Sequence, residues 1–500
     1  MMPLIFERKS KNSGDLLPST SKANVAKGLL PQNMLRKIDA GLPEVCELDV
    51  VRHFTELSQK NFCVDTNFYP LGSCTMKYNP KVNDQITSWP FYARIHPYQR
   101  EDHIQGMLEI VQETEAMLGE ITGMDAFSLQ PAAGAQGEFA GLLMCRAYHD
   151  EQGSKRNNIL IPDSAHGTNP ASAQLCGYDV VQVKTDAEGR VDIEDLRNKA
   201  DQNTACLMLT NPNTLGIFEK SISDITSIMH GVGSLVYYDG ANMNALMGIA
   251  KPGDMGFDIV HVNLHKTFAV PHGSGGPGSG PVGVCAKLEK YLPYPRLKKT
   301  EEGLIWDYNR PESIGRLRSF YGNPGAFLRS YCYIKALGRE GLKEVSESAV
   351  LNANYLKAKL AKHYAMPHDA YCMHEFVCSA KKQKVFGVKA LDIAKRLLDY
   401  GIHAPTIYFP LIVEEAMMIE PTETESKQTL DRFIQVMIDI AEESEADPES
   451  LLNAPTQTPI TRIDEVTAAR KPNIRWNPDS SDDAGTQVNL SLKTTTTCCT

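Results

Sequence analysis

The sequence predicts an α/β fold, in which a large domain built on a mainly parallel β-sheet is followed by a smaller C-terminal α+β domain. Between about residues 120 and 290, short apolar runs alternate with segments of helical periodicity, the pattern of crossover units that cover both faces of a parallel sheet with helices. After about residue 310 this alternation gives way to one long helical region and fewer strand candidates. At 500 residues the chain is long enough for both domains.

The elements of the large domain follow from the spacing of apolar residues. Helical spacing over Glu101–Gly119 predicts an amphipathic helix. The strands expected after it are Asn158–Ile161, Asp179–Val183, Ala205–Thr210, Leu235–Tyr238, Asp258–Asn263 and Pro281–Ala286. The helices expected between them are Glu138–His149, Ile193–Lys199 and Ser223–His230. Because ligands of such sheets bind at the carboxyl ends of the strands, residues that directly follow a strand are the candidates for a site.

The flanking regions are an N-terminal arm, a small domain and a tail. The arm contains two expected helices, Pro31–Ala40 and Val50–Lys60, and the loop Tyr69–Pro80, which Pro and Gly interrupt. The small domain is expected to contain the helices Arg329–Lys362, Lys389–Tyr400 and Ser426–Glu443 and the strands Glu375–Ser379 and Ile407–Ile412. The expected division is therefore 1–95 for the arm, 96–310 for the large domain, 311–475 for the small domain and 476–500 for a polar tail, which we expect to be disordered.

Composition narrows the class of protein. A net charge of -10 disfavours a nucleic-acid partner. No apolar run is long enough to span a bilayer, and the N-terminus lacks the apolar core of a secretory signal. The twelve cysteines are dispersed and form no C-x-x-C pair, which disfavours a metal site and fits a reducing cytosol. We therefore expect a cytoplasmic enzyme that binds neither nucleic acid nor a membrane.

Lys266 directly follows an apolar strand candidate and precedes the glycine-rich run Gly273–Gly280. Burial of a lysine is costly and lowers its pKa, and an unprotonated amine is what forms an imine with an aldehyde cofactor. A strand-end lysine that reaches solvent is the alternative, and it is the commoner case for a lysine taken alone.

Asp239 closes the preceding strand candidate, Leu235–Tyr238. A carboxylate at this place can pair with the protonated pyridine nitrogen of pyridoxal phosphate, which makes the ring an electron sink. The alternative is an ordinary turn aspartate before Gly240. Asp239 and Lys266 on successive strands, in this order, together predict a pyridoxal-phosphate site with Lys266 as the Schiff-base lysine.

Three further segments follow strands or open a helix. Small residues in Gln130–Glu138 precede a helix, where free N–H groups and the helix dipole suit a phosphate. The alternative is a tight turn that happens to be rich in glycine. His166 could stack on a cofactor ring or transfer protons, or it could be a structural histidine. Thr210–Gly216 offers the amides of Asn211 and Asn213 for a ring hydroxyl, or forms an Asn-Pro turn.

These segments resemble the glycine cleavage system P-protein family, in the second, cofactor-bearing subunit of its two-subunit bacterial form. The resemblance extends from about residue 65 to residue 425. The motifs that carry it are Tyr69–Pro80, Gln130–Glu138, Ala165–Ala171, Thr210–Gly216, Asn263–Phe268 and Glu420–Glu425.

The resemblance implies a pyridoxal-phosphate enzyme of fold type I, similar to aspartate aminotransferase. It implies that Lys266 holds the cofactor, that Asp239 pairs with its ring nitrogen and that His166 stacks on its ring. It also implies that Ala135 and Gln136 bind the phosphate, and that Asn211 or Asn213 binds the ring hydroxyl.

The implied reaction is decarboxylation of glycine, with release of CO2 and transfer of the aminomethyl group to the lipoyl arm of the H-protein. The implied partner is P-protein subunit 1, with two copies of each subunit. The segment Gly72–Asn79 is a candidate wall of the channel for the lipoyl arm. His166, His265 and His272 are equal candidates for a general base in the last step.

Rival functions remain open at this point. An aminotransferase needs an arginine for a second carboxylate, and none can be assigned from the sequence. A cysteine desulfurase needs a reactive cysteine, and Cys74 lies in a loop without an obvious activating base. A non-catalytic scaffold subunit is the third alternative, and the presence of Lys266 argues against it.

Overall fold

The computed structural model describes residues 3–8, 31–38, 42–43, 45–272, 278–472 and 474. The chain divides into two compact units, Met1–Pro459 and Ile460–Thr500. Most of the glycine-rich run after Lys266 (273–277) and the expected disordered tail (476–500) lie outside the described residues. In the second unit, the described helix α15 (Glu465–Arg470) begins where the Asp464 carboxylate accepts a hydrogen bond from Thr467 N.

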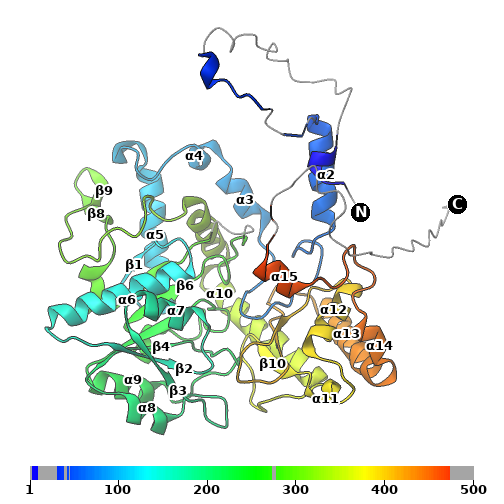
Figure 1. The fold of residues 1–500 in the computed structure, drawn as a ribbon. Coiled ribbons are helices and arrows are strands. Elements are labelled where there is room, and N and C mark those ends of the chain that lie inside the picture. The colour runs from blue at the N-terminus through cyan, green and yellow to red at the C-terminus, as the bar shows by residue number, and fades with distance from the viewer. Residues whose placement is uncertain are drawn as a thin grey trace. The chain divides into compact units, whose positions relative to one another are not determined.

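The first unit is built around a mainly parallel sheet, as the sequence predicts (Figure 1). The strand order is β1-β7-β6-β5-β4-β2-β3, and β6, β5, β4, β2 and β3 run parallel. β7 is antiparallel to both of its neighbours. The strands are β1 (Ala126–Ser128), β2 (Asn158–Pro162), β3 (Asp179–Val183), β4 (Thr204–Leu209), β5 (Leu235–Gly240), β6 (Ile259–Val262) and β7 (Val282–Val284).

Helices bury both faces of this sheet. The helices are α5 (Gln105–Thr122), α6 (Gly134–Glu151), α7 (Thr168–Leu175), α8 (Ile193–Lys199) and α9 (Ile222–Gly231). Side chains alternate between the faces along a strand: Leu235 and Tyr237 belong to the core that contains α6, and Val236 and Tyr238 to the core that contains α5 and α9. The same alternation places Asp239 on the α6 face, where the candidate site lies.

The sequence prediction missed several short elements of this domain. β1 has only three residues, too few for a recognisable pattern. α7 follows β2 in a segment for which no helix was predicted, because its apolar residues are few and the helix is only eight residues long. A further hairpin, β8 (Arg296–Thr300) and β9 (Gly303–Asp307), was also not predicted.

The small domain contains the antiparallel sheet β10-β12-β11. Its elements are β10 (Phe376–Ser379), α11 (Lys381–Lys384), α12 (Ala390–Asp399), β11 (Thr406–Ile407), β12 (Ala416–Ile419), α13 (Lys427–Ala446) and α14 (Pro448–Leu452). The expected strand Ile407–Ile412 is wrong beyond its first residue, since Pro410 has no N–H for a strand ladder. The sheet is completed instead by β12, whose four buried residues include neither Val nor Thr.

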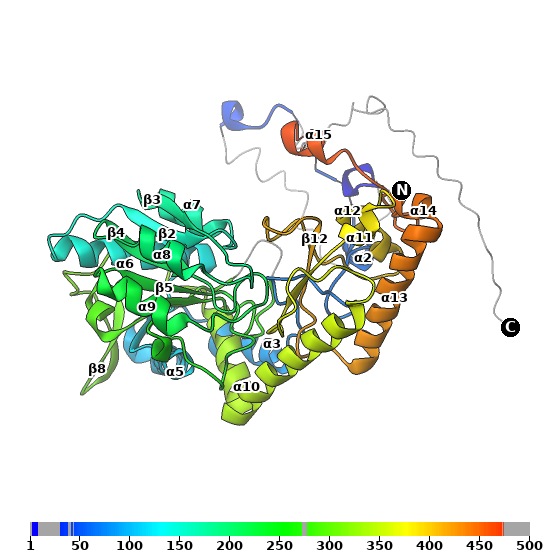
Figure 2. The same ribbon diagram turned by 90° about the horizontal axis from the view of Figure 1, so that it is seen from below.

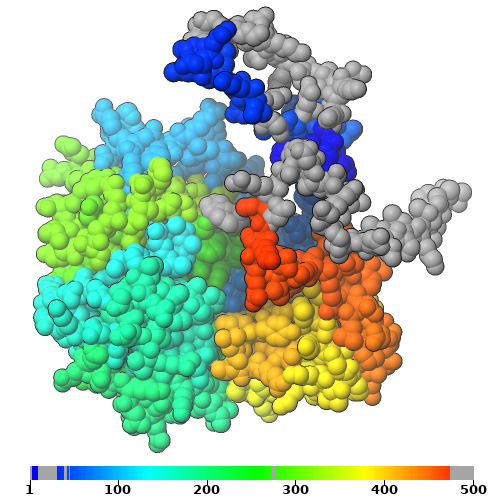
Figure 3. Space-filling view, viewed as in Figure 1, coloured from blue at the N-terminus to red at the C-terminus, as the bar shows by residue number. Residues whose placement is uncertain are grey.

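One helix joins the two domains. α10 (Pro324–Leu360) contacts α5 of the large domain and β10 and α13 of the small domain, and Figure 2 shows it passing beneath both. It bends at Gly338, where φ is 61° and ψ is -169°. Figure 3 shows the segments on either side of this helix gathered into two neighbouring bodies, green to cyan and yellow to orange.

The described residues of the N-terminal arm form short helices joined by irregular segments. Its helices are α2 (Glu47–Gln59), α3 (Lys81–Thr87) and α4 (Pro90–Ala93), and its short 3₁₀ turns include Ile5–Glu7 and Gln32–Met34. The expected helix Pro31–Ala40 is wrong over its described part, which forms only the second of these turns. Met34 and Ile38 are largely exposed there, so no buried face stabilises a helix. No helix of the described residues is long and apolar enough to cross a membrane.

Candidate active site

A cavity of about 250 Å³ lies at the carboxyl ends of β5 and β6, where open α/β sheets bind their ligands. The large domain, the arm and the small domain all contribute to its wall. The lining side chains that carry polar groups are Ser73, Glu138, His166, Thr168, Thr210, Thr214, Asp239, Asn242, His261, Asn263, His265, Lys266, His374 and Glu375.

Lys266 follows β6 and is half-buried at this cavity. Its Nζ donates to Ser73 O at 2.7 Å and to Asn242 Oδ1 at 3.2 Å. Ser73 belongs to the loop Tyr69–Pro80 and has a left-handed φ of 65°. The amine is therefore held by two neutral acceptors and makes no ion pair with a described residue.

Asp239 is the penultimate residue of β5 and is 4% exposed. Its Oδ2 accepts from Asn169 Nδ2 at 3.1 Å, and its Oδ1 accepts from Ala241 N at 3.1 Å. Burial opposes ionisation, but His261, these hydrogen bonds and Lys266 outweigh it, so the pKa of Asp239 lies below its ordinary value. The carboxylate is thus a buried anion that faces the cavity.

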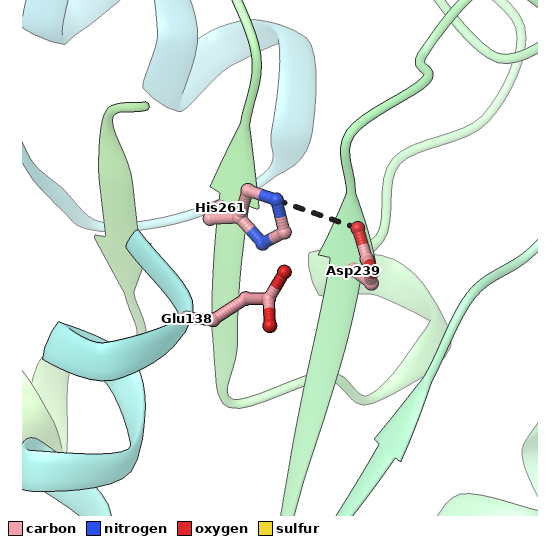
Figure 4. A group of neighbouring side chains, drawn as sticks. All are labelled: Glu138, Asp239 and His261. Atoms are coloured by element: carbon pink, nitrogen blue, oxygen red, sulfur yellow. Dashed lines mark ion pairs between the residues drawn. The ribbon is translucent and has the colours of Figure 1, made fainter. Parts of the chain in front are cut away.

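Glu138 and His261 surround this carboxylate (Figure 4). They come from the second turn of α6 and from β6, and His261 Nε2 lies 3.4 Å from Asp239 Oδ1. Burial and the charge of Asp239 raise the pKa of Glu138 to about 7. Burial also lowers the pKa of His261, whose Nδ1 lies 2.6 Å from Tyr237 OH. Asp239 therefore carries the negative charge of the cluster, His261 is neutral near pH 7, and Glu138 is protonated below about pH 7.

The N-terminus of α6 forms another wall. No described residue accepts a hydrogen bond from the N–H groups of Gly134 and Ala135, which leaves two donors free beside the cavity. A Cβ on Gly134 would come within 2.6 Å of Asn263 Oδ1, itself a buried acceptor without a donor. Gln136 does not line the cavity, because its Oε1 accepts from Ala132 N at 2.7 Å within the same turn.

The three candidate histidines are not equivalent. His166 lines the cavity but is exposed, with its ring 5.7 Å from that of Phe409. His265 also lines the cavity, and burial, with His272 and Lys266 nearby, lowers its pKa to about 4. His272 is not among the lining residues.

Asn211 and Asn213 are buried but do not reach the cavity. Asn211 Oδ1 accepts from Glu219 N, and Asn213 Oδ1 accepts from Leu215 N and Ile217 N. The alternative given for this segment, an Asn-Pro turn, therefore describes these two side chains. Their neighbour Thr210 does line the cavity, and its hydroxyl is buried without a partner.

The sequence prediction did not identify several polar residues here. His374 and Glu375 directly precede β10, and Glu420 directly follows β12. All three are buried, and their nitrogen and carboxylate oxygens lie within 4.8 Å of one another. The strand-end argument could have found only Glu420, which follows β12, a strand that the sequence prediction missed; His374 and Glu375 lie at the amino end of β10, where that argument does not apply.

The sequence of this chain matches known protein families and relatives. Residues 15–297 match the family described as Glycine cleavage system P-protein, and residues 345–457 match Glycine dehydrogenase, C-terminal domain. The chain is 57% identical over 477 residues to proteins of Staphylococcus aureus strains USA300 and MSSA476 called "Probable glycine dehydrogenase (decarboxylating) subunit 2". These alignments cover 95% of this chain and 97% of each relative.

Solved structures share the fold. A glycine decarboxylase (P-protein) of the glycine cleavage system, in inhibitor-bound form, superposes with a TM-score of 0.71 at 21% identity and covers 83% of this chain and 94% of its own. A cysteine desulfurase of Thermococcus onnurineus has a TM-score of 0.59 at 14% identity, covering 76% and 95%. The fold is thus the type I fold of pyridoxal-phosphate enzymes that the sequence predicts. By sequence match and identity, the chain belongs to the glycine cleavage system P-protein family.

Proposed function

We propose that this chain decarboxylates glycine with pyridoxal phosphate and transfers the aminomethyl group to the lipoyl arm of an H-protein, releasing CO2. The observation that carries the proposal is one cavity in which Lys266, Asp239 and the free N-terminus of α6 meet, in a chain of the P-protein family. The relatives' description as subunit 2 supports a partner subunit 1, and we propose two copies of each.

The groups around the cavity fit the cofactor. Lys266 supplies an amine, Asp239 a buried anion, and Gly134 and Ala135 supply free N–H groups where a phosphate needs donors. The hydroxyl of Thr210 is a buried polar group without a partner. These atoms are costly to bury unpaired, which supports a polar ligand in this space.

Each residue then has a defined task. Lys266 would hold the cofactor aldehyde, and Ser73 and Asn242 keep its amine at the cavity. Asp239 would keep a proton on the ring nitrogen, because its charge is fixed by Asn169 and the Ala241 N–H.

The remaining contacts with the cofactor are assigned from the positions of residues around the cavity. The helix α6 would bind the phosphate through Gly134 and Ala135. Thr210 would bind the ring hydroxyl in place of Asn211 or Asn213, whose side chains are used within their own turn. His166, at the exposed end, would lie against the ring face. When bound, the cofactor supplies the electron sink for the bond that breaks on loss of CO2.

The rival reading as a cysteine desulfurase finds less support. Burial raises the pKa of the Cys74 thiol, so the reactive thiolate is disfavoured near neutral pH. Cys74 is also not among the residues that line the cavity. All ten cysteines in the described part of the chain are free, which supports a reducing cytoplasm as the site of action.

The test is the visible absorption spectrum of the purified chain with pyridoxal phosphate, before and after borohydride. We expect a visible band, and after reduction a cofactor fixed to the peptide that contains Lys266. Lys266→Ala should lose both. The matched control Lys251→Ala, which removes an exposed lysine paired with Glu120, should retain both.

Glycine-dependent bicarbonate exchange, measured with subunit 1 and lipoylated H-protein, then tests the reaction. Exchange only in the full mixture supports the proposal. A reducible band without exchange would support the cofactor but not the reaction. An aminotransferase or a cysteine desulfurase would then be the favoured function. No band in the wild-type chain would refute the proposal.

A further inference from the structure

Two motifs that resemble the family, Tyr69–Pro80 and Glu420–Glu425, are joined directly beside the active site. Thr75 donates to Glu420 twice, from its N to Oε2 at 3.0 Å and from its Oγ1 to Oε1 at 2.6 Å. Lys77 Nζ lies 2.7 Å from Glu423 Oε1. The cofactor contacts proposed above account for neither pair. What these contacts hold in place is a second cluster of carboxylates, on the small-domain side of the cavity.

Glu420 is fully buried, but it is the carboxyl group of this cluster with the most hydrogen-bond donors around it. Besides the two bonds from Thr75, it accepts from Asn244 Nδ2 at 2.5 Å and from Asn242 Nδ2 at 3.4 Å. Burial raises the pKa of Glu420 to about 7, but the four donors and Lys266 favour its ionised form and keep this pKa below that of Glu375. These donors point their N–H and O–H hydrogens at the Glu420 oxygens, as expected around a carboxylate anion.

Glu375 is the carboxyl group of this cluster with few hydrogen-bond donors around it. It is 4% exposed, lines the cavity, and accepts one hydrogen bond, from Ser73 N to Oε2 at 2.7 Å. Oxygens of Glu375 and Glu420 lie within 4.8 Å of each other. Two buried carboxyl groups at this separation do not both ionise near neutral pH. The proton belongs on Glu375, because Glu420 has the donors that stabilise a charge.

The titratable groups that face Glu375 agree with this assignment. Burial and the charge of Glu420 raise the pKa of Glu375 to about 8. Burial, with Lys266 nearby, lowers the pKa of His374 to about 3, so this imidazole is neutral. Cys74 and Cys372 also lie within electrostatic range, and burial raises the pKa of both thiols. Lys266 is thus the one cation that faces Glu375 among the described residues.

The peptide of Ser73 links this acid to the reactive lysine. Its N–H donates to Glu375, and its carbonyl accepts from Lys266 Nζ. Asn242 forms the second link, since its Oδ1 accepts from Lys266 and its Nδ2 lies 3.3 Å from His374 Nε2. A neutral carboxylic acid is therefore positioned one residue away from the amine, in the wall of the same cavity.

We propose that Glu375 is the proton donor of the transfer step, as the protonated member of a pair with Glu420. This inference rests on the proposed function. The electron pair released with CO2 forms the bond from the aminomethyl carbon to one lipoyl sulfur, and the S–S bond breaks. The other sulfur leaves with the electrons of that bond and takes the proton of Glu375, so the disulfide is reduced. The Glu375 carboxylate regains a proton from solvent before the next turnover.

The experiment compares wild type, Glu375→Gln and Glu414→Gln, each reconstituted with cofactor, subunit 1 and lipoylated H-protein. Glu414 is an exposed control in the same domain, paired with Lys384. We expect Glu375→Gln to lower kcat for aminomethyl transfer about 100-fold or more, with the borohydride-reducible band retained. The wild-type kcat should fall as pH rises through about 8, where Glu375 loses its proton, and Glu375→Gln should lose this dependence. Glu414→Gln should match wild type.

Glu420→Gln gives a second, independent readout. Removing the neighbouring charge should lower the pKa of Glu375, so the alkaline fall of kcat should move to lower pH. The infrared spectrum of wild type minus that of Glu375→Gln at pH 7 should show the carbonyl stretch of a protonated carboxylic acid, because other protonated carboxyl groups such as Glu138 cancel in the subtraction. Wild type minus Glu414→Gln should not show it. An unmoved alkaline limb in Glu420→Gln, transfer by Glu375→Gln within about threefold of wild type, or absence of the carboxylic-acid band would each overturn this inference. A wild-type chain with neither reducible band nor transfer would instead refute the proposed function.

Discussion

Replacing Lys77 by methionine would show how strongly the loop Tyr69–Pro80 is anchored in the active site. Lys77 Nζ lies 2.7 Å from Glu423 Oε1 and 2.9 Å from Tyr333 OH, and the two charged side chains are 1% and 8% exposed. Burial opposes the charge of Lys77, but Glu423 and Tyr333 outweigh it, so the pKa of Lys77 lies above its ordinary value. Methionine fills a similar volume without the charge and leaves the buried Glu423 carboxylate without its cation.

The size of the effect follows from burial. Removing one partner of a buried ion pair costs about 3–5 kcal/mol of unfolding free energy, and an exposed pair contributes about 0–1 kcal/mol. The same loop region offers a matched control, because Lys81 Nζ lies 2.6 Å from Asp65 Oδ2 with both side chains about half exposed. Lys77→Met should therefore lose about 3–5 kcal/mol, and Lys81→Met less than about 1 kcal/mol.

Urea unfolding followed by circular dichroism measures both losses. The double variant Lys77→Met with Glu423→Gln should recover a large part of the loss, since it no longer buries an unpaired charge. Cofactor occupancy of Lys77→Met should also fall, because Ser73 lies in the loop that Lys77 anchors. A loss for Lys77→Met no larger than that for Lys81→Met would refute the reasoning.

Two other predictions concern stability. The pKa of Glu138 is raised from 4.5 to about 7 by burial beside Asp239, so the protonated form stabilises the fold and this contribution is lost as pH rises through that range. Thermal melts at a series of pH values should show Glu138→Gln gaining stability relative to wild type between those pH values, and a flat difference would contradict this. Gly216→Ala would place a Cβ 1.9 Å from Glu375 O at a φ of +75°. It should cost far more, in the same melts, than Gly153→Ala, which adds only left-handed strain of about 1–2 kcal/mol at an open position; equal costs would show that the contact is relieved.

Much of the large domain could be predicted because its signals are local. Each strand of the parallel core is a short apolar run, and a polar residue that ends such a run must lie at the sheet edge. This reasoning found Lys266 and Asp239, and the structure brings both to one cavity. It failed where elements are short, as for β1 and β12, and where a helix had no buried face, as at Pro31–Ala40.

The sequence by itself determined the fold class, the family and the strand ends that carry the candidate site. Only the tertiary structure decided which polar side chains face the cavity. Asn211 and Asn213 carry suitable amides, but their oxygens accept from nearby backbone N–H groups, a choice that depends on side-chain direction. Glu375 and Glu420 are separated in the chain by three strands and two helices, and they form a pair because the small domain folds β10 against β12. Their shared proton is a property of distance and burial, which no residue spacing in the chain specifies.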